Sequence, residues 1–113
     1  MKRLALALLA SCATAPLEIQ DYPCPPQGTT LTYASFGQRF IDTNCSTCHS
    51  ASAGSRHGAP ENFQFDTIED VHHRADRIFV RAAATNTSMP PGPVDPPPDE
   101  RDKLAEWLAC GAP

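Results

Sequence analysis

Two cysteines and a histidine stand together in the segment DTNCSTCHSAS, residues 42–52. Two residues separate Cys45 from Cys48, and His49 follows the second cysteine directly. Thiols and an imidazole at this spacing can attach a haem, take part in a tetrahedral zinc site, or form a redox-active dithiol. Each of these chemistries needs different companions elsewhere in the chain.

The haem interpretation of C-x-x-C-H has a direct chemical basis. Two thiols at a fixed separation add across the two vinyl groups of the porphyrin, and the histidine that follows then lies where its imidazole can bind the iron. Cys45, Cys48 and His49 supply all three groups.

The companions that zinc or a dithiol would need are poorly represented. Zinc needs four ligands, with a second pair at comparably tight spacing. The adjacent His72 and His73 would point to different sides of a helix, and Cys24 and Cys110 stand alone. A thioredoxin-like dithiol is expected within alternating strands and helices, a pattern that the sequence lacks. The motif therefore favours haem, with zinc and dithiol chemistry as the alternatives.

Met89 is the candidate for the sixth coordination position of a haem iron. It is the single methionine once Met1 is removed, and it stands in TSMPPG between predicted helices. Methionines that fill core gaps usually lie on helix faces, and Met89 stands instead beside two prolines in a predicted loop. As a ligand, its thioether would raise the reduction potential of the iron. The rival ligands are His57, His72 and His73, for which a solvated or structural role is the simpler interpretation.

The N-terminal segment MKRLALALLASC has the layout of an export signal. Basic residues precede the apolar run 4–10, which is too short to span a bilayer because about 20 apolar residues are needed. The run ends in a sequence that resembles a bacterial lipobox, so residues 1–11 are predicted to be removed and Cys12 to carry lipid. Cleavage after Ala15 is the alternative. Either way the protein is predicted to be exported, and the lipobox makes it a membrane-anchored lipoprotein facing the periplasm or the cell surface.

Composition limits the size of the domain and the kind of partner. The 113 residues are 41% hydrophobic and 7% aromatic, which suits one small domain with a modest core. Without Lys2 and Arg3, seven basic residues face thirteen acidic ones, a net charge of −6. Such a domain repels phosphate backbones and anionic lipid, which argues against nucleic acid and favours a partner with a basic docking face.

The periodicity predicts an all-α, loop-rich domain without strands or repeats. Residues 12–30 form a proline-rich tether and strap, and the domain proper covers residues 31–113. Thr67 can cap the second helix in a capping box with Asp70, and Asp99 can cap the last. With their caps, the predicted helices cover residues 33–43, 67–84 and 99–111.

Residues 30–110 resemble the small class I cytochromes c. Gly37 stands eight residues before Cys45, as does the family glycine that lets the first helix cross the last one closely. Leu104 and Trp107 match the aliphatic and aromatic pair that packs into this crossing. The resemblance implies a small cytochrome c fold, with three to four short helices wrapped around one covalently bound haem c.

The resemblance also implies roles for one proline and one methionine. Pro60 is similar to the family proline whose carbonyl accepts the N–H of the ligating histidine, here His49, and Met89 follows His49 at a family-like distance. Iron with both axial positions filled implies an electron carrier and not an enzyme. The carrier is expected to be a monomer. The alternative is a haem c sensor or a peroxidase-like enzyme with an open sixth position.

The number of cysteines agrees with this scheme. Lipid on Cys12 and haem on Cys45 and Cys48 leave Cys24 and Cys110, out of five cysteines in all. In an oxidising compartment these two are expected to form a disulfide that fastens the strap to the last helix.

Overall fold

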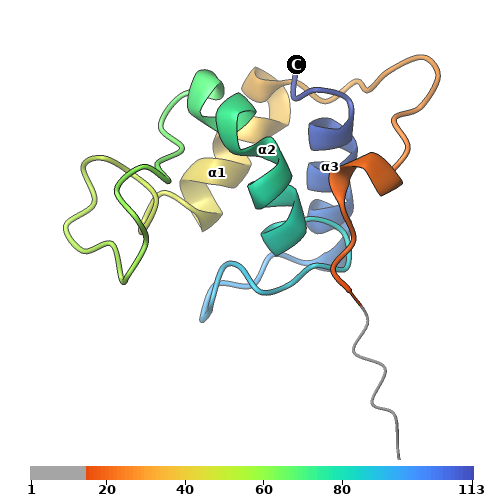
Figure 1. Ribbon diagram of the computed structural model, residues 1–113. Helices are drawn as coiled ribbons and strands as arrows, with labels where there is room; N and C mark the ends of the chain where they lie inside the picture. Colours follow the sequence, from red (N-terminus) through yellow and green to blue (C-terminus); the bar gives the residue numbers. More distant parts are fainter. Residues whose placement is uncertain (1–14) are drawn as a thin grey trace, which may run out of the picture.

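The computed structural model describes residues 15–113, and within that range the chain is helical with no strand. The predicted signal and Cys12 lie outside the described residues. Figure 1 shows the helices joined by long loops, and the domain is all-α, as the sequence predicts. The elements are η1 (Ile19–Asp21), η2 (Tyr33–Gly37), α1 (Gln38–Asn44), α2 (Ile68–Ala82) and α3 (Pro98–Ala109).

The first predicted helix is present in two parts, the π-helical turn η2 and the α-helix α1. Thr32 caps it, because its hydroxyl accepts the N–H of Ser35 at 3.0 Å and the Ser35 hydroxyl accepts the N–H of Thr32 at 2.9 Å. Its apolar residues Phe36, Phe40 and Ile41 are all buried in the core.

Helix α2 has the predicted capping box. The Thr67 hydroxyl accepts the N–H of Asp70, and the Asp70 carboxylate accepts the N–H of Thr67, each at 3.1 Å. The helix ends at Ala82, two residues before the predicted end. Ala83 is extended and Ala84 has a φ of +53°, so the backbone leaves the helical region there.

Helix α3 begins two residues earlier than predicted. Pro97 is its N-cap and Pro98 its first residue, so the prediction of Asp99 as cap is wrong. Proline suits the first position because its fixed φ is helical and its missing N–H has no partner there. Asp99 lies instead in the first turn, where its charge complements the helix dipole.

The close crossing predicted at Gly37 is present. A Cβ atom on Gly37 would lie 2.3 Å from Cζ2 of Trp107, which is far inside van der Waals contact. Trp107 and Leu104 are fully buried on α3, and the indole also stacks on Tyr33 with ring centroids 6.4 Å apart. Glycine is therefore required where the first helix passes the last.

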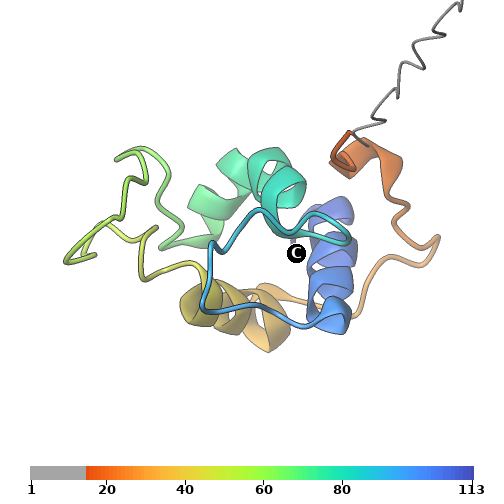
Figure 2. The ribbon, with the colours of Figure 1, turned by 90° about the horizontal axis from the view of Figure 1, so that it is seen from below.

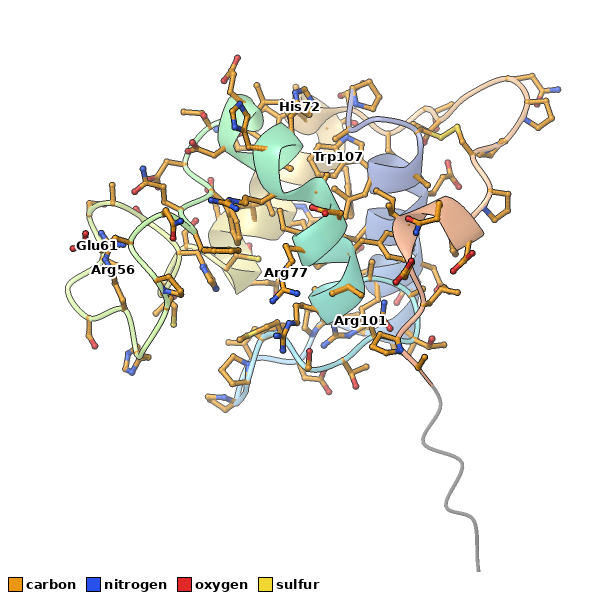
Figure 3. All side chains as sticks on the ribbon, viewed as in Figure 1. Arg56, Glu61, His72, Arg77, Arg101 and Trp107 are labelled. Atoms are coloured by element: carbon orange, nitrogen blue, oxygen red, sulfur yellow. A yellow bond between two sulfur atoms is a disulfide. The ribbon has the colours of Figure 1, made fainter. Side chains whose placement is uncertain are left out.

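The strap is attached to the domain at both ends. Cys24 and Cys110 form a disulfide, the pairing predicted from the cysteine count, and Figure 3 draws it as a yellow bond. At the other end, Asn86 accepts the N–H of Leu17 at 3.0 Å and donates to the Leu17 carbonyl at 2.8 Å. None of the helices in residues 15–113 is long and apolar enough to cross a membrane.

Candidate functional site

The cysteine motif continues the chain as one further turn after α1. Cys45 donates its N–H to the carbonyl of Ile41 at 2.8 Å, and the N–H of His49 donates to the carbonyl of Cys45 at 2.9 Å. Cys45 and Cys48 are both half-buried and neither is in a disulfide. The turn therefore presents two free thiols and the imidazole from one short segment.

Burial raises the pKa of the Cys45 thiol to about 12. The positive charge of Arg101 opposes this rise only in part, and the neighbouring Cys48 adds to it. The attacking cysteine of a dithiol oxidoreductase has a lowered pKa, since the thiolate is the nucleophile. The environment of Cys45 has the opposite effect and does not favour the dithiol alternative.

His49 is held by its ring and by its backbone. Its Nδ1 lies 2.6 Å from the carbonyl oxygen of Phe63, and because a carbonyl only accepts, Nδ1 is the donor. The Nε2 atom therefore keeps its lone pair in the neutral ring. The imidazole also stacks on Phe65 at 4.7 Å between centroids, and the N–H of Phe65 donates to the His49 carbonyl at 2.8 Å.

The predicted role of Pro60 as the acceptor for His49 is wrong in this structure. The acceptor is the carbonyl of Phe63, and the carbonyl of Pro60 instead accepts the N–H of Phe63 at 3.0 Å. This bond closes a turn over residues 60–63, so Pro60 helps to present Phe63. Sequence reasoning missed Phe63 because a backbone acceptor leaves no signal in residue type.

Arg74 connects this turn to α2. Its guanidinium carbon lies 4.2 Å from the centroid of the Phe63 ring, and its Nη2 donates to the carbonyl of Asn62 at 3.1 Å. The residue that orients His49 is thus attached to a helix and not only to its own loop.

Asp66 closes the loop between the motif and α2. Its carboxylate accepts the N–H of Ala51 at 2.8 Å, and this bond, aided by the Ser50 hydroxyl, lowers the pKa of Asp66. The ionised carboxylate is the form that holds the loop closed.

We expect this closure to be lost in acid. A carboxyl group with a lowered pKa stabilises the fold above the ordinary aspartate pKa of about 4, and this contribution disappears as the pH falls through the lower folded value. The NMR shift of the Ala51 amide should therefore titrate with a midpoint below about 4. Asp66→Asn should abolish that titration, and a midpoint at or above the ordinary value would contradict the proposed bond.

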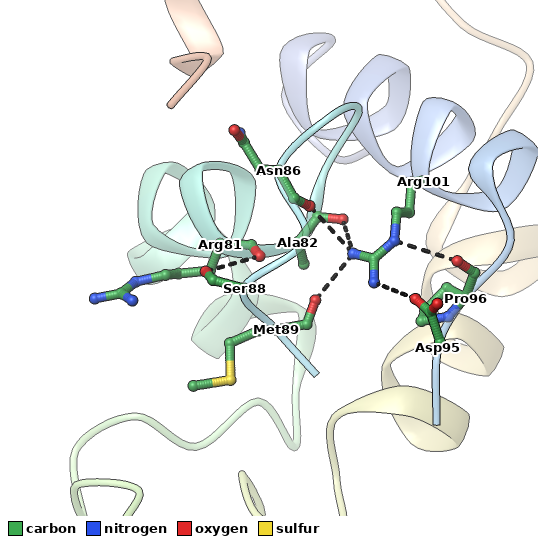
Figure 4. Close-up of polar contacts among 8 residues, drawn as sticks. All are labelled: Arg81, Ala82, Asn86, Ser88, Met89, Asp95, Pro96 and Arg101. Carbon is green, nitrogen blue, oxygen red and sulfur yellow. Dashed lines mark hydrogen bonds and ion pairs between the residues drawn. The ribbon is translucent and has the colours of Figure 1, made fainter. Parts of the chain in front are cut away.

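Met89 lies in the loop of residues 83–97, which joins α2 to α3. Figure 2, seen from below, shows this loop running across the lower side of the domain before it enters α3. The N–H of Met89 donates to the carbonyl of Arg81 at 2.8 Å, and its carbonyl accepts from Nη1 of Arg101 at 2.9 Å. Met89 as a residue is 37% exposed, and its side chain points away from Arg101 in Figure 4. The backbone is fixed while the thioether is available.

Arg101 is the second residue that sequence reasoning missed. It is buried on α3 and donates to several acceptors of the 83–97 loop (Figure 4). A signal existed in its spacing, since Arg101 precedes the buried Leu104 and Leu108 by three and seven residues and so shares their face. A lone arginine in an apolar stripe indicates a buried and paired guanidinium.

The rival histidines lie elsewhere. Nε2 of His72 donates to the carbonyl of Ala112 at 2.8 Å, so its ring supports the C-terminal segment. His57 and His73 are exposed. Among residues 15–113, no three side chains of His, Cys, Asp or Glu gather as they would around a metal ion.

No protein-family model matches the chain, and neither a curated protein nor a solved structure matches it.

Proposed function

We propose that this protein is an exported monohaem c-type cytochrome that transfers single electrons between redox partners. Cys45 and Cys48 would hold the haem covalently, and His49 and Met89 would ligate the iron. The bond from Nδ1 of His49 to the carbonyl of Phe63 carries the proposal. In the neutral ring it leaves the lone pair of Nε2 free, on the residue that directly follows the two free cysteines of the motif.

The donor set fits a haem c. Both thiols are free to form thioethers, and the acceptor on Nδ1 orients the imidazole and strengthens it as a donor. Two further observations agree with a small cytochrome c fold: the close crossing at Gly37 and the burial of Leu104 and Trp107.

The two ligand loops are attached to the same helix. Arg74 contacts Phe63 and so supports His49, while the carbonyl of Arg81 accepts the N–H of Met89. Arg74 and Arg81 are seven residues apart on α2, so they share one face of the helix and lie about 10 Å apart along its axis. Helix α2 therefore sets the spacing between the segments that bear the two proposed ligands.

A bound haem would supply a one-electron ferric/ferrous couple. The chain's own residues would tune it, since a thioether such as that of Met89 favours the ferrous state. With His49 and Met89 both bound, the iron has no position for a substrate, so we propose a carrier and not an enzyme.

The location and the partner rest on the sequence. Export by residues 1–11 and lipid on Cys12 would place the protein at a membrane surface, facing the periplasm or the cell exterior. The net charge of −6 without Lys2 and Arg3 would favour weak, transient contact with a basic face of the redox partner.

Intact-mass measurement tests the covalent haem. Protein made together with a haem c assembly system is expected to carry the mass of one haem, and Cys45→Ala with Cys48→Ala is expected to lose it. Cys24→Ser with Cys110→Ser is the matched control, because it also replaces two cysteines but leaves the motif intact. The same spectrum shows whether Cys12 bears lipid. Absence of the haem mass from the natural chain would end the proposal.

Met89→Ala tests the sixth ligand. We expect the oxidised protein to have a weak far-red absorption band that is lost in this variant, because the band reports a sulfur ligand. Val94→Ala, which changes another exposed apolar residue of the same loop, should keep it. A high-spin spectrum of the natural protein would instead favour the sensor or peroxidase-like alternative with an open sixth position.

A further inference from the structure

A single buried side chain holds the loop that contains Met89. Arg101 is 2% exposed, and its Nη1 donates to the carbonyls of Ala82 at 2.8 Å, Asn86 at 3.2 Å and Met89 at 2.9 Å (Figure 4). These three acceptors lie before and at the methionine, so one nitrogen draws the chain from the end of α2 to Met89 toward α3.

The same guanidinium also holds the other half of the loop. Its Nε donates to the carbonyl of Pro96 at 3.2 Å, and its Nη2 pairs with the carboxylate of Asp95 at 2.9 Å. Arg101 therefore holds the loop on both sides of Met89 in the sequence, at Ala82 and Asn86 before it and at Asp95 and Pro96 after it. In return, the backbone carbonyl of Arg101 accepts the N–H of Ala84 at 3.0 Å.

Arginine is suited to this position in a way that lysine is not. It offers five N–H donors in a rigid planar fork and stays charged when it is buried. The only carboxylate of the set belongs to Asp95, whose side chain is 79% exposed, so backbone carbonyls supply most of the acceptors. Removal of the guanidinium would leave these carbonyls without their common donor, and the loop would lose its anchor.

We propose that Arg101 is the positioning residue for Met89, which it holds in place to ligate the haem iron. The inference rests on the proposed function. A ligand that raises the potential binds ferrous iron more tightly than ferric iron, so the ferric bond depends more on how well the loop presents the thioether. The effect of losing Arg101 should therefore appear first in the oxidised protein.

The experiment compares Arg101→Met with the natural haem-loaded protein, using added imidazole as a competing ligand. We expect the oxidised variant to lose the far-red sulfur band and to bind imidazole about tenfold more tightly or better, because the competing thioether is bound in only a fraction of molecules. Asp95→Ala removes one of the contacts and leaves the others, so a smaller tightening is expected. Because Asp95 is exposed, Asp95→Ala should fold, and its imidazole affinity tests the inference if Arg101→Met does not fold.

Leu104→Ala is the matched control, since it weakens the same helix at a fully buried position without removing a hydrogen bond of the loop. Urea unfolding should show that both variants lose stability, but only Arg101→Met should lose the band before unfolding begins. An unchanged band and imidazole affinity in Arg101→Met, or an equal loss in Leu104→Ala, would overturn the inference alone. A natural protein with no covalent haem or no sulfur band would overturn the proposed ligation first.

Discussion

Loss of the Cys24–Cys110 disulfide, by Cys24→Ser together with Cys110→Ser, is expected to lower the free energy of unfolding by about 4 kcal/mol. The two cysteines are 86 residues apart, so the bond closes nearly the whole domain into one loop and restricts the unfolded chain strongly. Urea unfolding at equilibrium measures the change.

The comparison should be made in the haem-loaded protein. Cys45 and Cys48 are close in sequence, so their attachment to one haem closes only a short loop and does not replace the long one. Hydrogen exchange adds a local test: protection should fall most in the described part of the strap, residues 15–30. A loss below about 1 kcal/mol would mean that the unfolded, haem-loaded chain is already restricted without the disulfide.

Gly37→Ala is expected to cost about 3 kcal/mol. The added methyl group would lie 2.3 Å from the Trp107 ring, and the indole is fully buried, so neither side can move without disturbing the crossing of the first and last helices. Thermal or urea unfolding measures this loss.

Two further variants separate the crossing from the general effect of the substitution. Gly54→Ala places a methyl group where no atom lies within 4 Å, so it should change stability by less than about 0.5 kcal/mol. Trp107→Phe creates room opposite Gly37, and the double variant should be more stable than the sum of the single effects predicts. Additive losses would show that the glycine matters for its backbone and not for the space it leaves.

Local sequence signals predicted the helices well and their ends less well. The apolar spacing and the capping box of Thr67 located α2, because both act within one turn of the chain. The predicted start of α3 was too late because the sequence favours Asp99 as the cap. Pro98 can itself occupy the first helical position, so the helix begins before the aspartate. The early end of α2 follows from the left-handed backbone of Ala84. Alanine is a good helix former, so its residue type did not indicate this end.

The candidate site was predictable where residue types carry the chemistry. Cys45, Cys48 and His49 are adjacent in sequence, so their spacing alone indicated a site. Phe63 and Arg101 were missed for two different reasons. The contribution of Phe63 is a backbone carbonyl, which any residue possesses, and the partners of Arg101 are carbonyls that only the folded loop brings within reach.

The attachment of both loops to α2 has a consequence for the speed of the proposed electron transfer. An electron carrier works fastest when its ligands hardly move between the two oxidation states, because every displacement adds to the reorganisation energy. Phe63 is held by Arg74, and Met89 is held by the carbonyl of Arg81 on the same helix. Motions of α2 as a rigid body would therefore carry both ligands together, and the distance between them would stay nearly constant through each turnover.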